Sequence, residues 1–162
     1  NSGTSRLNLA GVSCARLAST GVANALIVDK DNTSGALILF TYNSGVVGNI
    51  TTNGTTTAYN TSSDYRLKEN IEDMVGATDR LKALKPINFA WKADGHRVDG
   101  FLAHELQEVV PEAATGTKDE VDEEGNPVYQ GIDQSKLVPL LTKALQEAVA
   151  RIEALEAKLT NS

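Results

Sequence analysis

A serine and a lysine stand five residues apart in the stretch Ser63-Asp64-Tyr65-Arg66-Leu67-Lys68. A serine hydroxyl is a weak nucleophile near neutral pH unless a base takes its proton, and a lysine amine acts as that base only where desolvation lowers its pKa. The hydroxyl of Ser63 also lies beside the carbonyl group of the residue before it, Ser62. Attack there would give an N→O acyl shift and an ester that water can hydrolyse. The pair therefore predicts a single cut between Ser62 and Ser63.

The same residues have a plainer interpretation. Ser63 or Asp64 can cap a turn, and Lys68 can be a solvated surface charge, without any chemistry. A reactive pair needs burial at a subunit interface to make the lysine a base, and backbone N–H groups to stabilise the oxyanion. The spacing alone does not separate these two interpretations.

The pair lies where the composition of the chain changes. Residues 1–60 carry only five charged side chains among small polar and β-branched residues, whereas residues 61–162 carry the other 31. A step of this kind is typical of a boundary between two folding units. We therefore expect one unit at residues 1–62 and a second at residues 63–162, with the candidate pair at the junction.

Composition and charge also argue against several kinds of partner. The net charge of −6 falls almost wholly on the second part, which disfavours nucleic acid. Cys14 is a single cysteine, His104-Glu105 lacks the second histidine of a zinc helix, and the acidic residues 119–124 lack the spacing of a calcium loop. No apolar run is long enough to span a membrane, and no Gly-rich lysine loop for a nucleotide is present. We expect no metal, no cofactor and no membrane.

Residues 1–61 are expected to form short strands joined by tight turns. Their large apolar residues are too few to close a core within one chain. Intertwining with identical chains, as in the β-prisms and triple β-helices of fibrous viral proteins, is the simplest way to bury them; an ordinary small sandwich is the alternative. The predicted strands are Ala25–Val28, Gly35–Tyr42, Val46–Ile50 and Thr55–Tyr59, with turns at residues 43–45 and 52–55.

From Ser63 onward the pattern becomes mixed α and β, with an α+β core expected over residues 63–132. A turn and a short helix should end before Pro86, because the residue before a proline avoids the helical region. The predicted elements that follow are strands at 87–92 and 98–102, a helix at 103–110, and a second hairpin that pairs 118–121 with 128–132.

The last part of the chain has an unbroken heptad pattern, which predicts a coiled-coil helix over residues 133–160. An isolated helix of this length is marginal in water, so its apolar seam requires partners. The alternative is an amphipathic helix that packs on its own domain. The fibrous first part favours a trimer, although the small Ala148 alone is compatible with a dimer. The predicted trimer seam consists of Val138, Leu141, Leu145, Ala148, Ile152, Leu155 and Leu159.

An ordered set of motifs over residues 57–159 closely resembles the endosialidase-type C-terminal intramolecular chaperones of phage tail spikes and tail fibres. The set begins with the junction itself, Thr57 to Ile71, and continues through the core to the start of the last helix. The later motifs are Leu84-Lys85-Pro86 before the strand with Phe89 and Trp91, Gly100 to Leu106, Val110-Pro111-Glu112, and Leu137 to Leu141.

This resemblance implies a trimeric chaperone domain that assembles the preceding β-structured fibre and then cuts itself off. It assigns Ser63 as the nucleophile and Lys68 as the base, a Ser-Lys dyad, while Asp64 and Arg66 match the motif with supporting roles. The implied partners are two further copies of the chain and the upstream fibre, and no cofactor is implied. The implied location is a virion tail fibre or tailspike, assembled in the cytoplasm of the bacterial host, with the chaperone part released after assembly. A receptor on the host surface is left open.

Two functions from different classes are consistent with the sequence. The first is a chaperone whose single-turnover serine peptidase activity acts on its own chain. The second is a trimeric structural or adhesive fibre tip that has the same fold and stays attached without catalysis. In either case the start Asn1-Ser2-Gly3-Thr4 is neither a signal peptide nor a natural start, and indicates the C-terminal piece of a longer protein.

Overall fold

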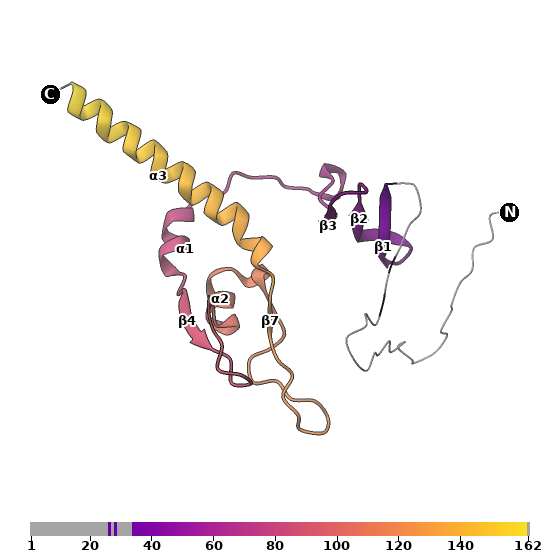
Figure 1. Ribbon diagram of the computed structural model, residues 1–162. Helices are drawn as coiled ribbons and strands as arrows, with labels where there is room; N and C mark the ends of the chain where they lie inside the picture. Colours follow the sequence, from indigo (N-terminus) through magenta and orange to yellow (C-terminus); the bar gives the residue numbers. More distant parts are fainter. Residues whose placement is uncertain (1–25, 27, 29–33, 162) are drawn as a thin grey trace. The chain divides into compact units, whose positions relative to one another are not determined.

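The computed structural model describes residues 26, 28 and 34–161. The chain divides between Ile71 and Glu72 into two compact units. The predicted mixture of sheets and helices, with a long helix at the C-terminal end, is confirmed (Figure 1). The predicted strand at residues 25–28 lies largely outside the described residues, as does most of the stretch 1–33.

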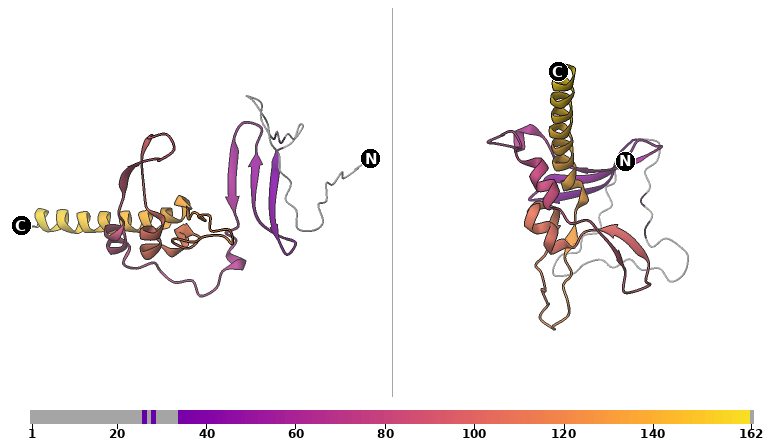
Figure 2. Two further views of the ribbon diagram at one scale, coloured as in Figure 1. Left: turned by 90° about the horizontal axis from the view of Figure 1, so that it is seen from below. Right: turned by 90° about the vertical axis from the view of Figure 1, so that its left-hand side faces the viewer.

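The first unit contains one antiparallel sheet whose strand order is β1-β2-β3. Its strands are β1 (Gly35–Tyr42), β2 (Gly45–Thr52) and β3 (Thr57–Thr61), which lie side by side in Figure 2. Asn43 and Ser44 join β1 to β2 with positive φ angles of 46° and 66°, as a tight hairpin turn requires. The predicted strand at 35–42 and the turn at 43–45 are confirmed, and the strand predicted at 46–50 lies within β2. The strand predicted at 55–59 runs instead over residues 57–61, because the side chain of Asn53 accepts hydrogen bonds from the amides of Thr55 and Thr56 and holds them in the turn.

The pairing of β2 with β3 depends on a glycine. Gly48 faces Thr61 in the last pair of this ladder, and it is buried. A Cβ atom at Gly48 would lie 2.8 Å from the carbonyl oxygen of Asn60, closer than real side chains allow. Glycine is therefore needed for β2 and β3 to approach at this end of the sheet.

Large apolar side chains of this sheet remain exposed to solvent. Phe40 is 52% exposed, Tyr59 80% and Leu39 56%. Among the described residues of the first unit, Gly48 alone is buried, and no second layer of described strands covers the sheet. A sheet in this condition requires a cover from outside its own three strands.

The second unit combines short helices, two small sheets and one long helix. The first small sheet is a hairpin, β4 (Ile87–Ala90) with β5 (Arg97–Gly100), and the second pairs β6 (Ala114–Thr115) with β7 (Gly131–Ile132). The helices are α1 (Ala77–Ala83), α2 (Ala103–Val109) and α3 (Leu137–Thr160), with 3-10 turns at Pro111–Ala113 and Gln134–Lys136.

Two sequence predictions in this unit need correction. The long helix starts at Leu137 rather than at residue 133, because the side chain of Asp133 accepts hydrogen bonds from the amide and hydroxyl of Ser135 and caps a separate 3-10 turn. The predicted hairpin of residues 118–121 with residues 128–132 does not form as two continuous strands, since only β7 is a strand there and it pairs with β6. Asp119 has a positive φ of 59°, and Val121 makes only an isolated bridge to Pro127, which has no N–H to donate.

The core of the second unit joins the three helices. Leu106 and Val110 from the α2 region pack with Leu137, Leu140 and Ala144 from the first half of α3. From residue 148 to residue 161, by contrast, every residue of the chain is exposed. The two halves of α3 therefore differ: the first packs on its own domain, and the second is left uncovered by the described residues.

Glu147, at the end of the packed half of α3, holds the start of α1. Its carboxylate accepts hydrogen bonds from the hydroxyl of Thr78, from the amide of Thr78 at 2.9 Å and from the amide of Ala77 at 3.4 Å. These bonds lower the pKa of Glu147 below its usual value, and the bond from the Thr78 hydroxyl has the largest effect. A carboxylate in this position satisfies amide groups that the helix itself leaves unpaired.

Acid is expected to weaken the second unit through Glu147. Because the folded carboxyl has the lower pKa, its stabilisation is present at neutral pH and is lost as the pH falls through the folded value. The variant Glu147→Gln should have a lower urea midpoint than the wild type at pH 7, and this difference should shrink towards pH 3. The matched control is Glu153→Gln, on the exposed half of α3. Equal midpoints for Glu147→Gln and the wild type across this range would contradict the assignment.

Candidate functional site

Ser63 and Lys68 are brought together by a single turn. The 3-10 helix Tyr65–Leu67 is capped by Asp64, whose side chain accepts a hydrogen bond from the amide of Arg66 at 2.9 Å. The turn folds the chain back on itself, and Lys68 Nζ donates a hydrogen bond to Ser63 Oγ at 2.7 Å. The two residues that the sequence singles out are thus in direct contact, at a distance suited to proton transfer.

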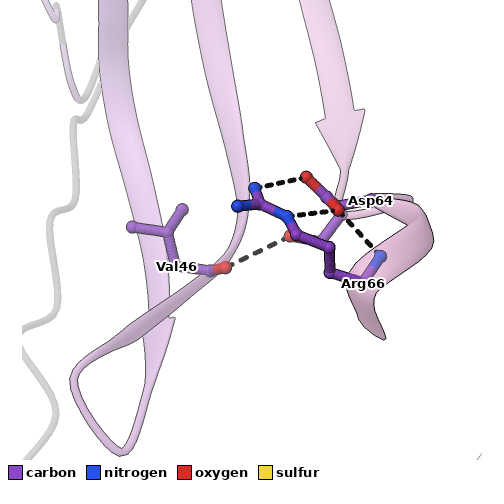
Figure 3. A network of polar contacts seen from close by, with 4 residues as sticks. Val46, Asp64 and Arg66 are labelled. Atoms are coloured by element: carbon purple, nitrogen blue, oxygen red, sulfur yellow. Dashed lines mark hydrogen bonds and ion pairs between the residues drawn. The ribbon is translucent and has the colours of Figure 1, made fainter. Parts of the chain in front are cut away.

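Asp64 and Arg66 pair with each other within this turn (Figure 3). Arg66 donates from Nε to one carboxylate oxygen of Asp64 at 2.9 Å and from Nη2 to the other at 2.7 Å. This forked pairing lowers the pKa of Asp64 and raises that of Arg66. Both side chains therefore support the turn that carries Ser63 and Lys68.

Ser62, on the other side of the candidate scissile bond, is attached to strand β2. Its amide donates a hydrogen bond to the carbonyl of Val47 at 3.2 Å, and its hydroxyl donates to the carbonyl of Val46 at 3.1 Å. The bond to the Val46 carbonyl is drawn as a dashed line in Figure 3. The sequence did not predict these two bonds of Ser62, because both acceptors are backbone carbonyl groups whose positions depend on the register of β2 against β3.

The whole junction faces solvent in the single chain. Every residue from 61 to 70 is exposed, Ser63 and Lys68 included. A lysine base requires withdrawal from water. The described part of this chain does not provide that withdrawal on its own.

The predicted trimer seam lies along one exposed stripe of α3. Leu145 is 66% exposed, Ile152 54% and Leu155 58%, and the remaining seam residues, Val138, Leu141, Ala148 and Leu159, are exposed as well. Val149, at 45% exposure, widens the stripe by one position that the heptad prediction left out. In the sequence, an apolar valine at the e position next to the seam indicates that the apolar stripe includes residue 149.

A hollow in the second unit was not predicted from the sequence. It has a volume of about 1060 Å³ and is lined by the β4–β5 hairpin and by the segment that leads into β7. Phe89 and Trp91 meet there edge to face, with ring centroids 5.1 Å apart. Its lining is mainly apolar and aromatic, and its titratable side chains are Lys92, Asp99 and Tyr129.

The described residues contain no cluster of three or more His, Cys, Asp or Glu side chains that could hold a metal ion. None of the helices formed by those residues is both long and apolar enough to cross a membrane.

Comparison with known proteins confirms the resemblance seen in the sequence. Residues 63–115 match the family described as chaperone of endosialidase. The chain is also 32% identical, over 102 residues, to the long tail fiber protein Gp37 of Enterobacteria phage K3 and to that of Enterobacteria phage T2. Each match covers 60% of this chain, but only 8% of the K3 protein and 7% of the T2 protein. The chain thus matches less than a tenth of the length of these relatives.

Proposed function

We propose that this chain, whose residues 63–115 carry the chaperone-of-endosialidase match, is the end of a phage tail fibre or tailspike together with the chaperone that assembles it. Residues 1–62 form the end of the fibre, and residues 63–162 trimerise, direct its folding and release themselves by a cut between Ser62 and Ser63. The observation that carries this proposal is the 2.7 Å hydrogen bond from Lys68 to Ser63, at the first residues of the matched segment. The tail fibre relatives support a location in the virion tail.

The exposed half of α3 supports self-association as a coiled coil. Residues 148–161 are exposed in the part of the chain that the structure describes, yet they carry Ile152, Leu155 and Leu159 on one stripe. A helical end of this length is marginal in water without packing partners. Three copies in parallel would bury the stripe and leave the charged residues of α3 outside.

The exposed sheet of the first unit supports an intertwined β-stalk. Residues 34–63 contain no charged side chain, so identical copies can approach without like-charge repulsion. Phe40 and Tyr59 would gain cover that the three strands do not give them. Burial of such apolar surface stabilises an assembly by about 25 cal/mol for each Å².

The cut follows from the contact at the junction. Lys68 Nζ, as a neutral amine, takes the proton of the Ser63 hydroxyl while Oγ attacks the carbonyl carbon of Ser62. The carbon–nitrogen bond of the Ser62–Ser63 peptide then breaks, the nitrogen receives the proton, and an ester joins Ser62 to Ser63 Oγ. Water hydrolyses this ester, which leaves a carboxylate on Ser62 and a free amine and hydroxyl on Ser63. One water molecule is consumed for each chain cut.

Assembly is the step that makes this reaction feasible. In the single chain the junction is exposed, and the lysine is not withdrawn from water. Contact with the neighbouring copies would remove water from the junction.

The exposure of the junction also favours a second candidate function. If the junction stays open to water in the assembled trimer, Lys68 is no base, and the chain is a permanently attached, uncut trimeric fibre tip.

Removal of the chaperone is expected to prevent assembly of the fibre end. A chain truncated after Ser62 should be aggregated or monomeric, because its strands bury too little apolar surface within one chain to overcome the entropy of ordering. Sedimentation of this truncated chain beside the Ser63→Ala full-length chain, which should stay whole, provides the comparison. A soluble, protease-resistant trimer from residues 1–62 expressed alone would remove the argument for a chaperone.

A further inference from the structure

We propose that Ser62 is a positioning residue that ties the scissile peptide to strand β2, so that the cut depends on a folded β2–β3 ladder. This inference rests on the proposed self-cleavage and adds a residue and a control element to it. Ser62 supplies the carbonyl carbon that Ser63 attacks. Its own side chain has no part in the transfer of protons, and its role is to fix where that carbonyl points.

Two hydrogen bonds hold Ser62 on β2. The amide donates to the carbonyl of Val47 at 3.2 Å and the hydroxyl to the carbonyl of Val46 at 3.1 Å. The first bond continues the β2–β3 ladder one step beyond its last pair, Gly48 with Thr61. The second has no counterpart in a regular ladder, because it uses a side chain. Together they fix both the main chain and the side chain of Ser62 against consecutive carbonyl groups of one strand.

The nucleophile and the base are held by a different element. Ser63 and Lys68 are positioned by the 3-10 turn, which Asp64 caps and Arg66 braces. The reacting atoms therefore come from two supports: the carbonyl of Ser62 from the sheet, and the hydroxyl and amine from the turn. Small misplacements in such an arrangement slow a reaction strongly, because attack needs the two atoms close and aligned.

The consequence is a check on folding that operates within each chain. If β2 is not formed, the carbonyls of Val46 and Val47 are not in place and Ser62 is free to rotate. The turn with Ser63 and Lys68 uses contacts only among residues 63–68, so it can form without the sheet. The cut would thus be slow in any chain whose β2–β3 ladder is not formed, even when the turn is intact.

The direct test is the rate of the cut in Ser62→Ala and Ser62→Thr, each measured on the trimeric full-length chain. Ser62→Ala removes the bond to Val46 and should slow the cut about fivefold, the effect of one hydrogen bond of about 1 kcal/mol. Ser62→Thr keeps a hydroxyl and should restore the wild-type rate. If Ser62 only stabilised the fold, Ser62→Ala would lower the amount of trimer. It would not slow the cut in chains that are still trimeric, and threonine would have no rate to restore.

A second test acts on the strand and leaves the junction residues unchanged. Gly48→Ala places a Cβ atom 2.8 Å from the carbonyl of Asn60 and should separate β2 from β3 near Ser62. Its cut should slow at least as much as that of Ser62→Ala. Gly45→Ala is the matched control, since its added Cβ meets only the carbonyl of Tyr42 at an ordinary 3.4 Å.

The outcomes separate this inference from the function on which it rests. Wild-type rates in both Ser62→Ala and Gly48→Ala, with Ser63→Ala left whole, would overturn the role of Ser62 and leave the self-cleavage standing. A cut at the same bond in Ser63→Ala, or no cut in the wild type, would overturn the self-cleavage and this inference with it. Slow cutting in Ser62→Ala, rescued by threonine, supports both.

Discussion

Replacement of Ser63 by alanine is expected to leave the chain whole, and replacement of Lys68 by alanine should slow the cut by about 10²–10⁴-fold. The first change removes the oxygen that attacks the carbonyl of Ser62, so no ester can form. The second removes the amine that lies 2.7 Å from that oxygen, and a positioned base contributes about this factor to a reaction of this kind. Gel electrophoresis of the assembled chains over time measures both effects.

Lys118→Ala is the matched control for the lysine, since it removes an exposed ammonium group of the second unit that lies far from the junction in the sequence. It should be cut at the wild-type rate. Cutting of the Ser63→Ala chain between residues 62 and 63 would show that another group attacks the carbonyl. A Lys68→Ala chain that is cut as fast as the control would show that the lysine has no part in the reaction.

Ile152→Asp is expected to abolish both trimerisation and the cut. Ile152 lies in the middle of the predicted seam at an a position, so the change places one carboxylate from each of three chains against the others. Burying such unpaired like charges costs several kcal/mol. If the assembled interface is what withdraws Lys68 from water, a change 84 positions along the chain from that lysine should also stop the chemistry.

The control for this prediction is Ala150→Asp, which places the same carboxylate at an f position, on the opposite face of the same helix. It should assemble and be cut as the wild type is. Sedimentation and gel analysis of one preparation of each variant give both readings. An Ile152→Asp chain that is monomeric yet cuts itself at the wild-type rate would separate the cut from assembly.

The elements that the sequence predicted well are those whose signals are local. Strand β1 follows from an unbroken β run at residues 35–42, and the end of α1 follows from Pro86. The turn that brings Lys68 to Ser63 is also local, since Asp64 caps it two residues from Arg66. The spacing therefore pointed to these two residues, and the resemblance to the family assigned their roles.

The features that the sequence did not predict depend on distant residues or on backbone atoms. The bond from Ser62 to Val46 joins residues 16 apart and exists only in one register of β2 against β3. The division of α3 into a packed half and an exposed half depends on where α1 and α2 dock, for which the heptad pattern carries no signal. The aromatic hollow gathers Phe89 and Tyr129, which are far apart in the chain, from two hairpins.

The central claim is tested most directly by the intact masses of the purified, assembled wild-type protein. We expect two species, one that ends at Ser62 with a free carboxylate and one that begins at Ser63 with a free amine, in equal amounts when the products are not separated before the measurement. The masses should sum to that of the whole chain plus one water molecule. A stable trimer in which every chain keeps its full mass would contradict self-cleavage and identify the domain as a permanently attached fibre tip.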